Sequence, residues 1–220
     1  MYMGDTVVKK LLIITEQPNY NPINLSDDKL SELKNDITAE LVEDIVECKY
    51  CKNFKKYCKG TILPLNFPEP ENKHSYKRFY KFVKIMENLL KENNINWYRT
   101  HYIKHHAKSI NKNNVKTECA EKFLLREIIE YKPDAIFSIG REATRWFIKK
   151  NKLNNIGIKS FRDAVNLTDN HKNTTIDFEG KRILLFAFDH PSNRNKFANK
   201  YTDIYTKNLI SKCVLNIKKA

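Results

Sequence analysis

The sequence contains no long apolar run. None of its hydrophobic stretches approaches the about 18 consecutive residues that a membrane-spanning helix needs. The first ten residues, MYMGDTVVKK, also lack the apolar core of a secretory signal peptide. Internal repeats and low-complexity linkers are absent as well. We therefore expect a cytoplasmic protein that does not enter the membrane.

Glycine is sparse, and acidic residues are outnumbered by basic ones. The chain has five glycines in 220 residues, and 26 Asp and Glu stand against 40 Lys and Arg, which gives a net charge of +14. Such an excess favours a polyanionic partner, most simply nucleic acid, and predicts salt-sensitive binding. The alternative is a basic surface of the kind that an AT-rich genome produces, since Asn, Lys and Ile are frequent. We expect nucleic acid as the partner and a monomeric protein.

Cysteine is also sparse, with five in the chain. In a reducing compartment five cysteines are not expected to form a disulfide framework, so clustered ones indicate metal or redox chemistry. Three of them form the pattern Cys48-x2-Cys51-x6-Cys58. This spacing favours a metal site, with tetrahedral zinc as one occupant. Cys213, near the C-terminus, is expected to be a buried thiol.

Apolar runs alternate with stretches of helical periodicity along the chain. Strands are expected at 9–16, 96–104, 133–140 and 183–188, and helices at 24–47, 76–92, 117–131, 141–150 and 195–218. This alternation predicts an α/β fold, with three α/β/α layers around a central, mostly parallel four-stranded sheet. We expect one domain, 1–220, with a Cys-rich insertion around 48–74. Irregular structure with room for a short hairpin is expected over 152–180.

The stretch RILLFAFDHPSNRN, residues 182–195, joins an expected buried strand to polar groups. Its apolar half suits a strand covered on both faces. The polar half follows at the carboxyl end of that strand, where open α/β sheets place their ligand sites. The simpler interpretation is a polar loop whose Asp and Asn cap the next helix.

Four separated stretches resemble, in order, the uracil-DNA glycosylase superfamily, and most closely its iron–sulfur-containing, thermophile-type branch. They are TEQPN at 15–19, YRTHYIKHHAK at 98–108, ECAEKFLLREIIEYKPDAIFSIGREATRWF at 118–147, and DHPSNRN at 189–195. The resemblance implies the same three-layer fold. It also implies a DNA glycosylase that flips out uracil or a damaged or modified pyrimidine, hydrolyses its N-glycosidic bond and leaves an abasic site. We expect a monofunctional enzyme because no lysine occupies an obvious nucleophile position.

The resemblance assigns three residues to catalysis. His190, in the His-Pro-Ser motif, would stabilise the negative charge that develops on the leaving base. Glu16 would orient water or stabilise the cationic sugar, and Gln17 would hold that water. Gln17 stands where the best-known members carry a water-activating Asp and the iron–sulfur branch an Ala, and it cannot act as a general base. A structural histidine at position 190 and an ordinary salt bridge by Glu16 are the alternatives.

The resemblance also places the substrate among four residues. His101 stands where most members read uracil with an Asn, so a different base could be read here. Tyr20 would pack beside the base and Phe67 would stack on it, with burial in the core as the alternative for Phe67. The substrate-binding residues are Tyr20, Phe67, His101 and Ser192.

Basic and strand-inserting residues would contact the DNA. Asn193 and Arg194 occupy the position of the intercalating loop of the family, and nearby lysines would contact phosphate. The DNA-binding residues are Asn193, Arg194, Lys196, Lys104 and Lys108.

Cys119 aligns with one cluster ligand of the iron–sulfur branch. It would complete a four-thiolate set for a [4Fe-4S] cluster with Cys48, Cys51 and Cys58. A structural zinc, held by the same three cysteines plus Cys119 or a histidine, is the alternative. Two other functions also stay open: a module of the same fold that binds nucleic acid without catalysis, and a hydrolase of free nucleosides.

Overall fold

The computed structural model describes residues 8–15, 77–102, 117–118, 120–191 and 195–220. The chain divides into two compact units. The first unit comprises Met1–Ile13, Glu69–Tyr98 and Pro133–Ala220, and the second comprises Ile14–Pro68 and Arg99–Lys132. The single-domain interpretation and the Cys-rich insertion stay predictions. The helix expected over 24–47 lies outside the described residues.

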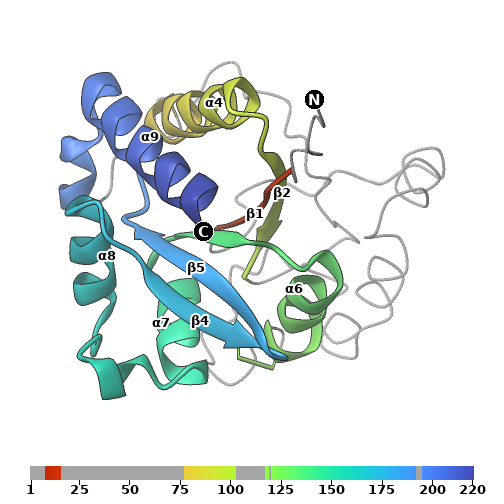
Figure 1. Cartoon of the computed structure of the whole chain (residues 1–220). Coiled ribbons are helices and arrows are strands. Elements are labelled where there is room, and N and C mark those ends of the chain that lie inside the picture. Colours follow the sequence, from red (N-terminus) through yellow and green to blue (C-terminus); the bar gives the residue numbers. More distant parts are fainter. Residues whose placement is uncertain (1–7, 16–76, 103–116, 119, 192–194) are drawn as a thin grey trace, which may run out of the picture. The chain divides into compact units, whose positions relative to one another are not determined.

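The fold is α/β, as the sequence predicts, but the sheet formed by the described residues has five strands rather than four. The strands are β1 (Lys10–Thr15), β2 (Asn96–His101), β3 (Ala135–Ile139), β4 (Thr174–Phe178) and β5 (Lys181–Phe188), in the order β2-β1-β3-β5-β4 (Figure 1). β3 and β5 run parallel, with Ala135 opposite Leu184 and Ile139 opposite Phe188. All five residues of β3 are buried, which is typical of a central strand of a parallel sheet.

The additional strand is β4, which pairs antiparallel with β5 at one edge of the sheet. Two residues connect them, Glu179 and Gly180, both with positive φ (51° and 79°). Positive φ at both positions is the geometry of a type I′ hairpin, which glycine adopts at little cost. β4 is short and lies within a polar stretch. For that reason its alternation is a weak sequence signal, and the sequence predicts four strands where the described residues form five.

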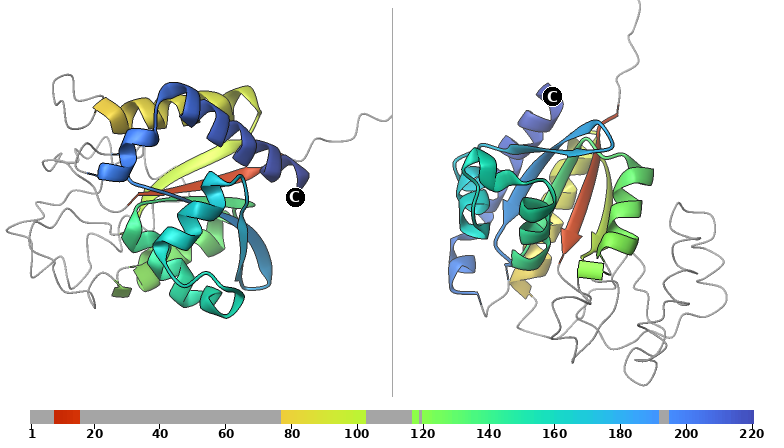
Figure 2. Two further views of the ribbon diagram at one scale, coloured as in Figure 1. Left: turned by 90° about the vertical axis from the view of Figure 1, so that its left-hand side faces the viewer. Right: turned by 90° about the horizontal axis from the view of Figure 1, so that it is seen from below.

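Helices cover both faces of the sheet in the first unit. α4 (Lys77–Glu92) and α9 (Asp203–Lys219) lie side by side on one face, and α7 (Arg141–Lys150) and α8 (Phe161–Asp169) lie on the other (Figure 2). Short helical turns occur at Leu153–Ile156 (η2) and Lys196–Lys200 (η3). The second unit holds a π-helical turn, Ala120–Leu124 (η1), followed by α6 (Leu125–Tyr131).

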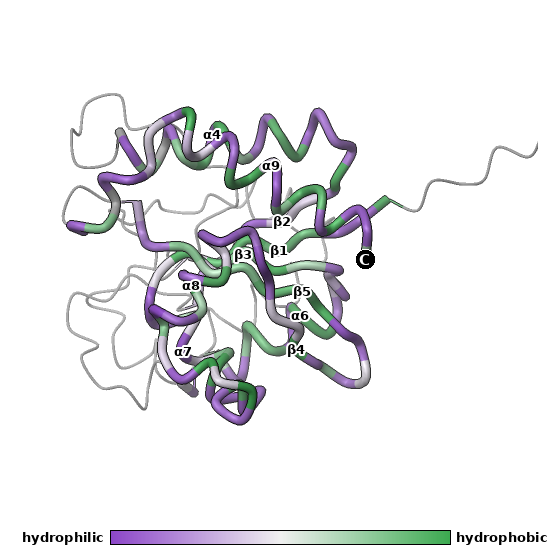
Figure 3. Tube along the Cα trace, turned by 60° about the vertical axis from the view of Figure 1, so that its left-hand side comes forward, coloured by the Kyte–Doolittle hydropathy of each residue, from purple (hydrophilic) through white to green (hydrophobic). Residues whose placement is uncertain are grey.

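The hydrophobic core of the first unit lies between the sheet and helices α4 and α9. Hydrophobic residues gather along β3 and β5 (Figure 3). Phe137 of β3 makes edge-to-face contacts with Phe186 and Phe188 of β5. From the helices come residues at helical spacing: Phe82, Val83, Met86 and Leu90 on α4, and Leu209, Ile210, Cys213, Val214 and Ile217 on α9. Each large side chain buried in this way contributes about 1.5–3 kcal/mol.

One sequence expectation in the first unit is confirmed by this core. The Cys213 thiol is buried, and burial raises its pKa well above the ordinary value. No helix within the described part of the chain is long and apolar enough to cross a membrane.

The segment 152–180, expected to be irregular, contains α8. This helix begins with a capping box: the Ser160 hydroxyl accepts the Asp163 N–H, and the Asp163 carboxylate accepts the Ser160 N–H. The helix buries one face, through Phe161, Ala164, Val165 and Thr168, which stand at helical spacing. The polar composition of the segment therefore hides a short amphipathic helix.

The last helix begins later than the sequence suggests. Instead of one helix over 195–218, the chain forms η3 and then α9. Thr202 separates them because its hydroxyl accepts the Tyr205 N–H and caps α9.

Candidate active site

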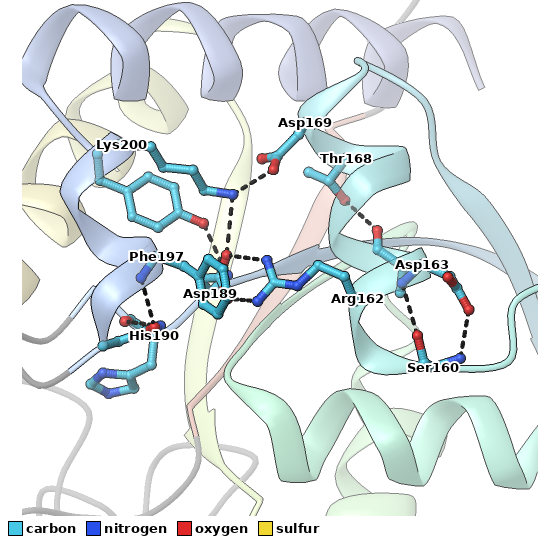
Figure 4. A network of polar contacts seen from close by, with 12 residues as sticks. Ser160, Arg162, Asp163, Thr168, Asp169, Asp189, His190, Phe197 and Lys200 are labelled. Carbon is cyan, nitrogen blue, oxygen red and sulfur yellow. Dashed lines mark hydrogen bonds and ion pairs between the residues drawn. The ribbon is translucent and has the colours of Figure 1, made fainter.

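The carboxyl end of β5 is fastened to helix α8 by a bidentate ion pair. Asp189 directly follows β5, and its side chain is 1% exposed. The Arg162 guanidinium, from the first turn of α8, donates to both carboxylate oxygens at 2.9 Å (Figure 4). Paired N–H···O bonds of this kind fix orientation as well as distance. Close by, the Ala187 N–H of β5 donates to the Thr168 hydroxyl of α8 at 2.9 Å.

A second cation, Lys200, also lies beside the Asp189 carboxylate. The Lys200 ammonium, from η3, lies 3.1 Å from the Asp189 carboxylate and also forms an ion pair with Asp169 at the end of α8. Tyr205 of α9 donates its hydroxyl to Asp169 at 2.9 Å. Two carboxylates and two cations thus form one network, drawn from α8, η3 and the residue that follows β5, and Tyr205 of α9 adds a hydroxyl to it.

The charges of the network shift the pKa values of its members. Burial is the largest influence on Asp189 and raises its pKa, but hydrogen bonds from Arg162 and Lys200, together with their charges, outweigh it. The pKa of Asp189 is therefore below its ordinary value of 3.8, and the carboxylate is ionised at neutral pH. Tyr201 accepts the Asp189 N–H at 2.9 Å. Burial, followed by the Asp189 charge, raises the pKa of Tyr201 well above 10.0, so this hydroxyl stays protonated.

His190 follows Asp189, and its imidazole points away from the Asp189 carboxylate (Figure 4). The ring stacks on Phe79 of α4, with 5.2 Å between centroids and 6° between planes. Its backbone carbonyl accepts the Asn195 side-chain N–H at 3.0 Å. The half-buried ring thus has one face against an aromatic side chain, and its backbone is bonded at a defined point.

The second unit presents another histidine at the end of a strand. His101, the last residue of β2, lies with its Nδ1 2.5 Å from the Thr15 hydroxyl at the end of β1. The Tyr102 N–H donates to the Thr15 carbonyl at 2.7 Å. Behind them, the buried Thr100 hydroxyl donates to Glu127 at 2.8 Å. These bonds fix the His101 ring relative to the strand ends.

Three of the residues predicted for the site lie in the described part of the chain. His190 and Lys196 belong to the first unit and His101 to the second. Lys196 is exposed, with its ammonium 5.1 Å from the centre of the Phe197 ring. The remaining predicted residues lie outside the described part: Glu16, Gln17, Tyr20, Phe67, Ser192, Asn193, Arg194, Lys104, Lys108, Cys48, Cys51, Cys58 and Cys119.

The four-cysteine site is among those predictions and stays one. Within the ranges that the structure describes, no group of three or more His, Cys, Asp or Glu side chains could hold a metal ion.

Sequence reasoning missed Arg162, Lys200 and Asp169 as partners of the His190 segment. Ser160 and Asp163 stand three apart before an apolar residue, which is a capping-box signal for α8. That signal locates a helix but not its partner. Nothing in the sequence pairs Arg162 with Asp189, because the two residues are 27 positions apart.

The model of one protein family, the Uracil DNA glycosylase superfamily, matches residues 47–213, which is more than half of the chain. No curated protein matches the chain.

Proposed function

The chain belongs to the uracil DNA glycosylase superfamily, and we propose that it is a monofunctional DNA glycosylase. The proposed reaction is hydrolysis of the N-glycosidic bond of uracil, or of a damaged or modified pyrimidine, in DNA. The base leaves and an abasic site remains. The family match, together with the position of His190 two residues after the end of β5, carries this proposal.

Breaking an N-glycosidic bond leaves negative charge on the base and positive charge on the sugar. A hydrogen-bond donor placed at a carbonyl of the departing base stabilises the negative charge. We assign that role to the His190 imidazole. One donor of this kind is worth about 3 kcal/mol, or a factor on the order of 10² to 10³ in rate.

The surroundings of His190 suit this role because they restrict the imidazole before substrate binds. Stacking on Phe79 sets the plane of the ring, and Asp189 and Asn195 hold the backbone on which it stands. A donor that needs no reorganisation during the reaction stabilises developing charge more effectively.

Base selection is assigned to His101 in the second unit. An imidazole offers fewer simultaneous donor and acceptor groups than the Asn amide that other family members are expected to carry here. The hydrogen bond between Nδ1 and Thr15 already uses one ring nitrogen. We therefore propose that His101 forms hydrogen bonds with the base edge that differ from those by which family members usually recognise uracil. A modified pyrimidine is the principal alternative substrate.

Access to a base in duplex DNA requires that it be flipped out, at a cost of a few kcal/mol. The net charge of +14 supports binding to the phosphate backbone that would accompany this step. Lys196 is exposed and suits a phosphate contact.

The branch of the superfamily is a separate proposal, which rests on sequence pattern alone. It assigns an iron–sulfur cluster to Cys48, Cys51, Cys58 and Cys119. A brown protein with visible absorption and stoichiometric iron supports this assignment. A colourless protein with one zinc per chain favours the structural zinc instead.

The glycosylase proposal is tested with oligonucleotides that carry uracil or one of a panel of modified pyrimidines. Single-turnover assays detect alkali-labile abasic sites, and fluorescence anisotropy measures binding. Wild-type protein is expected to release at least one base. His190→Ala is expected to slow release by about 10²- to 10³-fold while binding persists.

The control is His171→Asn, which alters an exposed histidine in the turn after α8. Asn is chosen because His171 has a φ of 60°, which Asn tolerates better than Ala. This variant should release base at the wild-type rate. Intact binding with no release on any substrate would refute catalysis and favour a module that binds nucleic acid without it.

A further inference from the structure

Both the edge and the face of the Arg162 guanidinium are engaged. Its edge donates two hydrogen bonds to Asp189, each 2.9 Å long. Its centre lies 4.0 Å from the centroid of the Phe197 ring. Arginine is suited to such a position because its planar group combines a hydrogen-bonding fork with a surface that stacks on aromatic rings.

These contacts belong to a closed ring of interactions that includes His190, which we call the circuit. From Arg162 the circuit runs through Asp189 to His190, whose carbonyl accepts the Asn195 amide. The Asn195 side-chain oxygen accepts the Phe197 N–H at 3.1 Å, and the Phe197 ring returns to Arg162. Every link joins residues of the first unit.

The circuit restrains His190 through its backbone. Asp189 is held by its carboxylate and by its N–H, which donates to Tyr201. With the residue before it fixed and its own carbonyl bonded, His190 keeps mainly the freedom of its side chain. The stack on Phe79 removes much of that. The segment 152–180, expected from the sequence to be irregular, thus supplies Arg162, which contacts both Asp189 and Phe197 in the circuit.

We propose that Arg162 is a positioning residue for base excision, which acts through Asp189 and Phe197 to hold the His190 imidazole against Phe79. The inference rests on the proposed function for its catalytic consequence. The effect of Arg162 on the position of the His190 ring does not depend on that function. If Arg162 merely fastens α8 to β5, its substitution would lower stability without moving that ring.

The ring position is measured directly by NMR. A proton on an imidazole stacked against a phenyl ring is shielded, so the His190 Cε1 proton should resonate upfield of an exposed histidine. Its signal is assigned as the one that disappears in His190→Ala. In Arg162→Gln and Arg162→Lys the signal should move toward the position of an exposed histidine. Arg162→Lys keeps the charge and decides the question alone if Arg162→Gln does not fold.

The control is Lys181→Met, which removes an ion pair with Asp134 at the opposite end of β5. It should leave the His190 signal and the rate of base release unchanged. The two Arg162 variants should release base about 10- to 100-fold more slowly in single turnover, as expected for a misplaced catalytic group. Their affinity for DNA should stay within about threefold of wild type, since the exposed lysines are untouched.

The two readouts separate the inference from the proposed function. If wild-type protein releases no base, the proposed function fails, and the His190 signal still shows whether Arg162 positions the ring. An unmoved signal in both Arg162 variants overturns the inference. A moved signal with an unchanged rate of release also overturns it, because the ring position would then not matter to the reaction.

Discussion

Replacing Asp189 by Asn removes the charge at the centre of the ion-pair network while keeping the size of the side chain. The Asp189 side chain is 1% exposed, whereas Arg162 is 35% exposed and Lys200 is 25% exposed. Without the carboxylate the two cations face each other, and the Asn oxygen can accept only part of the former hydrogen bonds. The folded state should therefore lose stability.

The size of this loss follows from the exposure of the partners. Breaking a wholly buried ion pair costs about 3–5 kcal/mol. Water reaches both cations here, so we expect about 2–3 kcal/mol, below the range for a buried pair. For a chain of this size that corresponds to a fall in Tm of roughly 4–12 °C.

The loss should depend on pH in a defined direction. The pKa of Asp189 is lowered in the folded protein, so its carboxylate stabilises the fold above the unfolded pKa. That contribution disappears as the pH falls through the folded pKa, below 3.8. The stability difference between wild type and Asp189→Asn should be constant between about pH 5 and pH 8 and shrink under more acidic conditions.

Urea denaturation followed by tryptophan fluorescence measures this difference, since the chain has two tryptophans and Trp146 is buried. Asp203→Asn is the matched control, because Asp203 makes an exposed ion pair with Lys81. It should cost less than about 1 kcal/mol. An Asp189→Asn protein as stable as this control, or a difference that varies between about pH 5 and pH 8, would refute the reasoning.

Three further outcomes are expected. Ser160→Ala should lower stability by about 1 kcal/mol in thermal unfolding, because the capping box of α8 is lost; an unchanged Tm would contradict this role. Thr15→Val, which removes the hydroxyl bonded to His101, should change the ratio of release rates for uracil and modified pyrimidines, whereas equal ratios would count against His101 as the base reader. Binding to DNA should weaken steeply as salt rises, because the net charge is +14; a flat salt dependence in a binding titration would exclude a phosphate-dominated interface.

Strong local patterns made the centre of the fold predictable. The apolar runs at 133–140 and 183–188 became β3 and β5, because strands covered on both faces must be apolar throughout. Helix α8 escaped prediction for the opposite reason, and strand β4 was anticipated only as part of a short hairpin over 152–180. Each is short and covered on only one face, so its polar residues conceal the pattern.

The residues of the candidate site were likewise predictable from the sequence only in part. The place of His190 just after β5 was predictable because the apolar run before it is a recognisable strand, whereas its catalytic role stays a prediction. Arg162 was not predictable, because its role comes from the packing of α8 on β5. A single sequence reports the spacing of residues within an element but not which distant charge an element brings to a strand end.

Helix α8 contributes to the network at both ends, through Arg162 in its first turn and Asp169 at its last residue. The two residues are seven apart, about two helical turns, and so share one face. Deleting a single residue between them would rotate Asp169 by about 100° and shift it by about 1.5 Å. Insertions and deletions inside this helix should thus be poorly tolerated, while its solvent-facing residues accept wide substitution. Among related sequences, the length of α8 should therefore vary less than the identity of its residues.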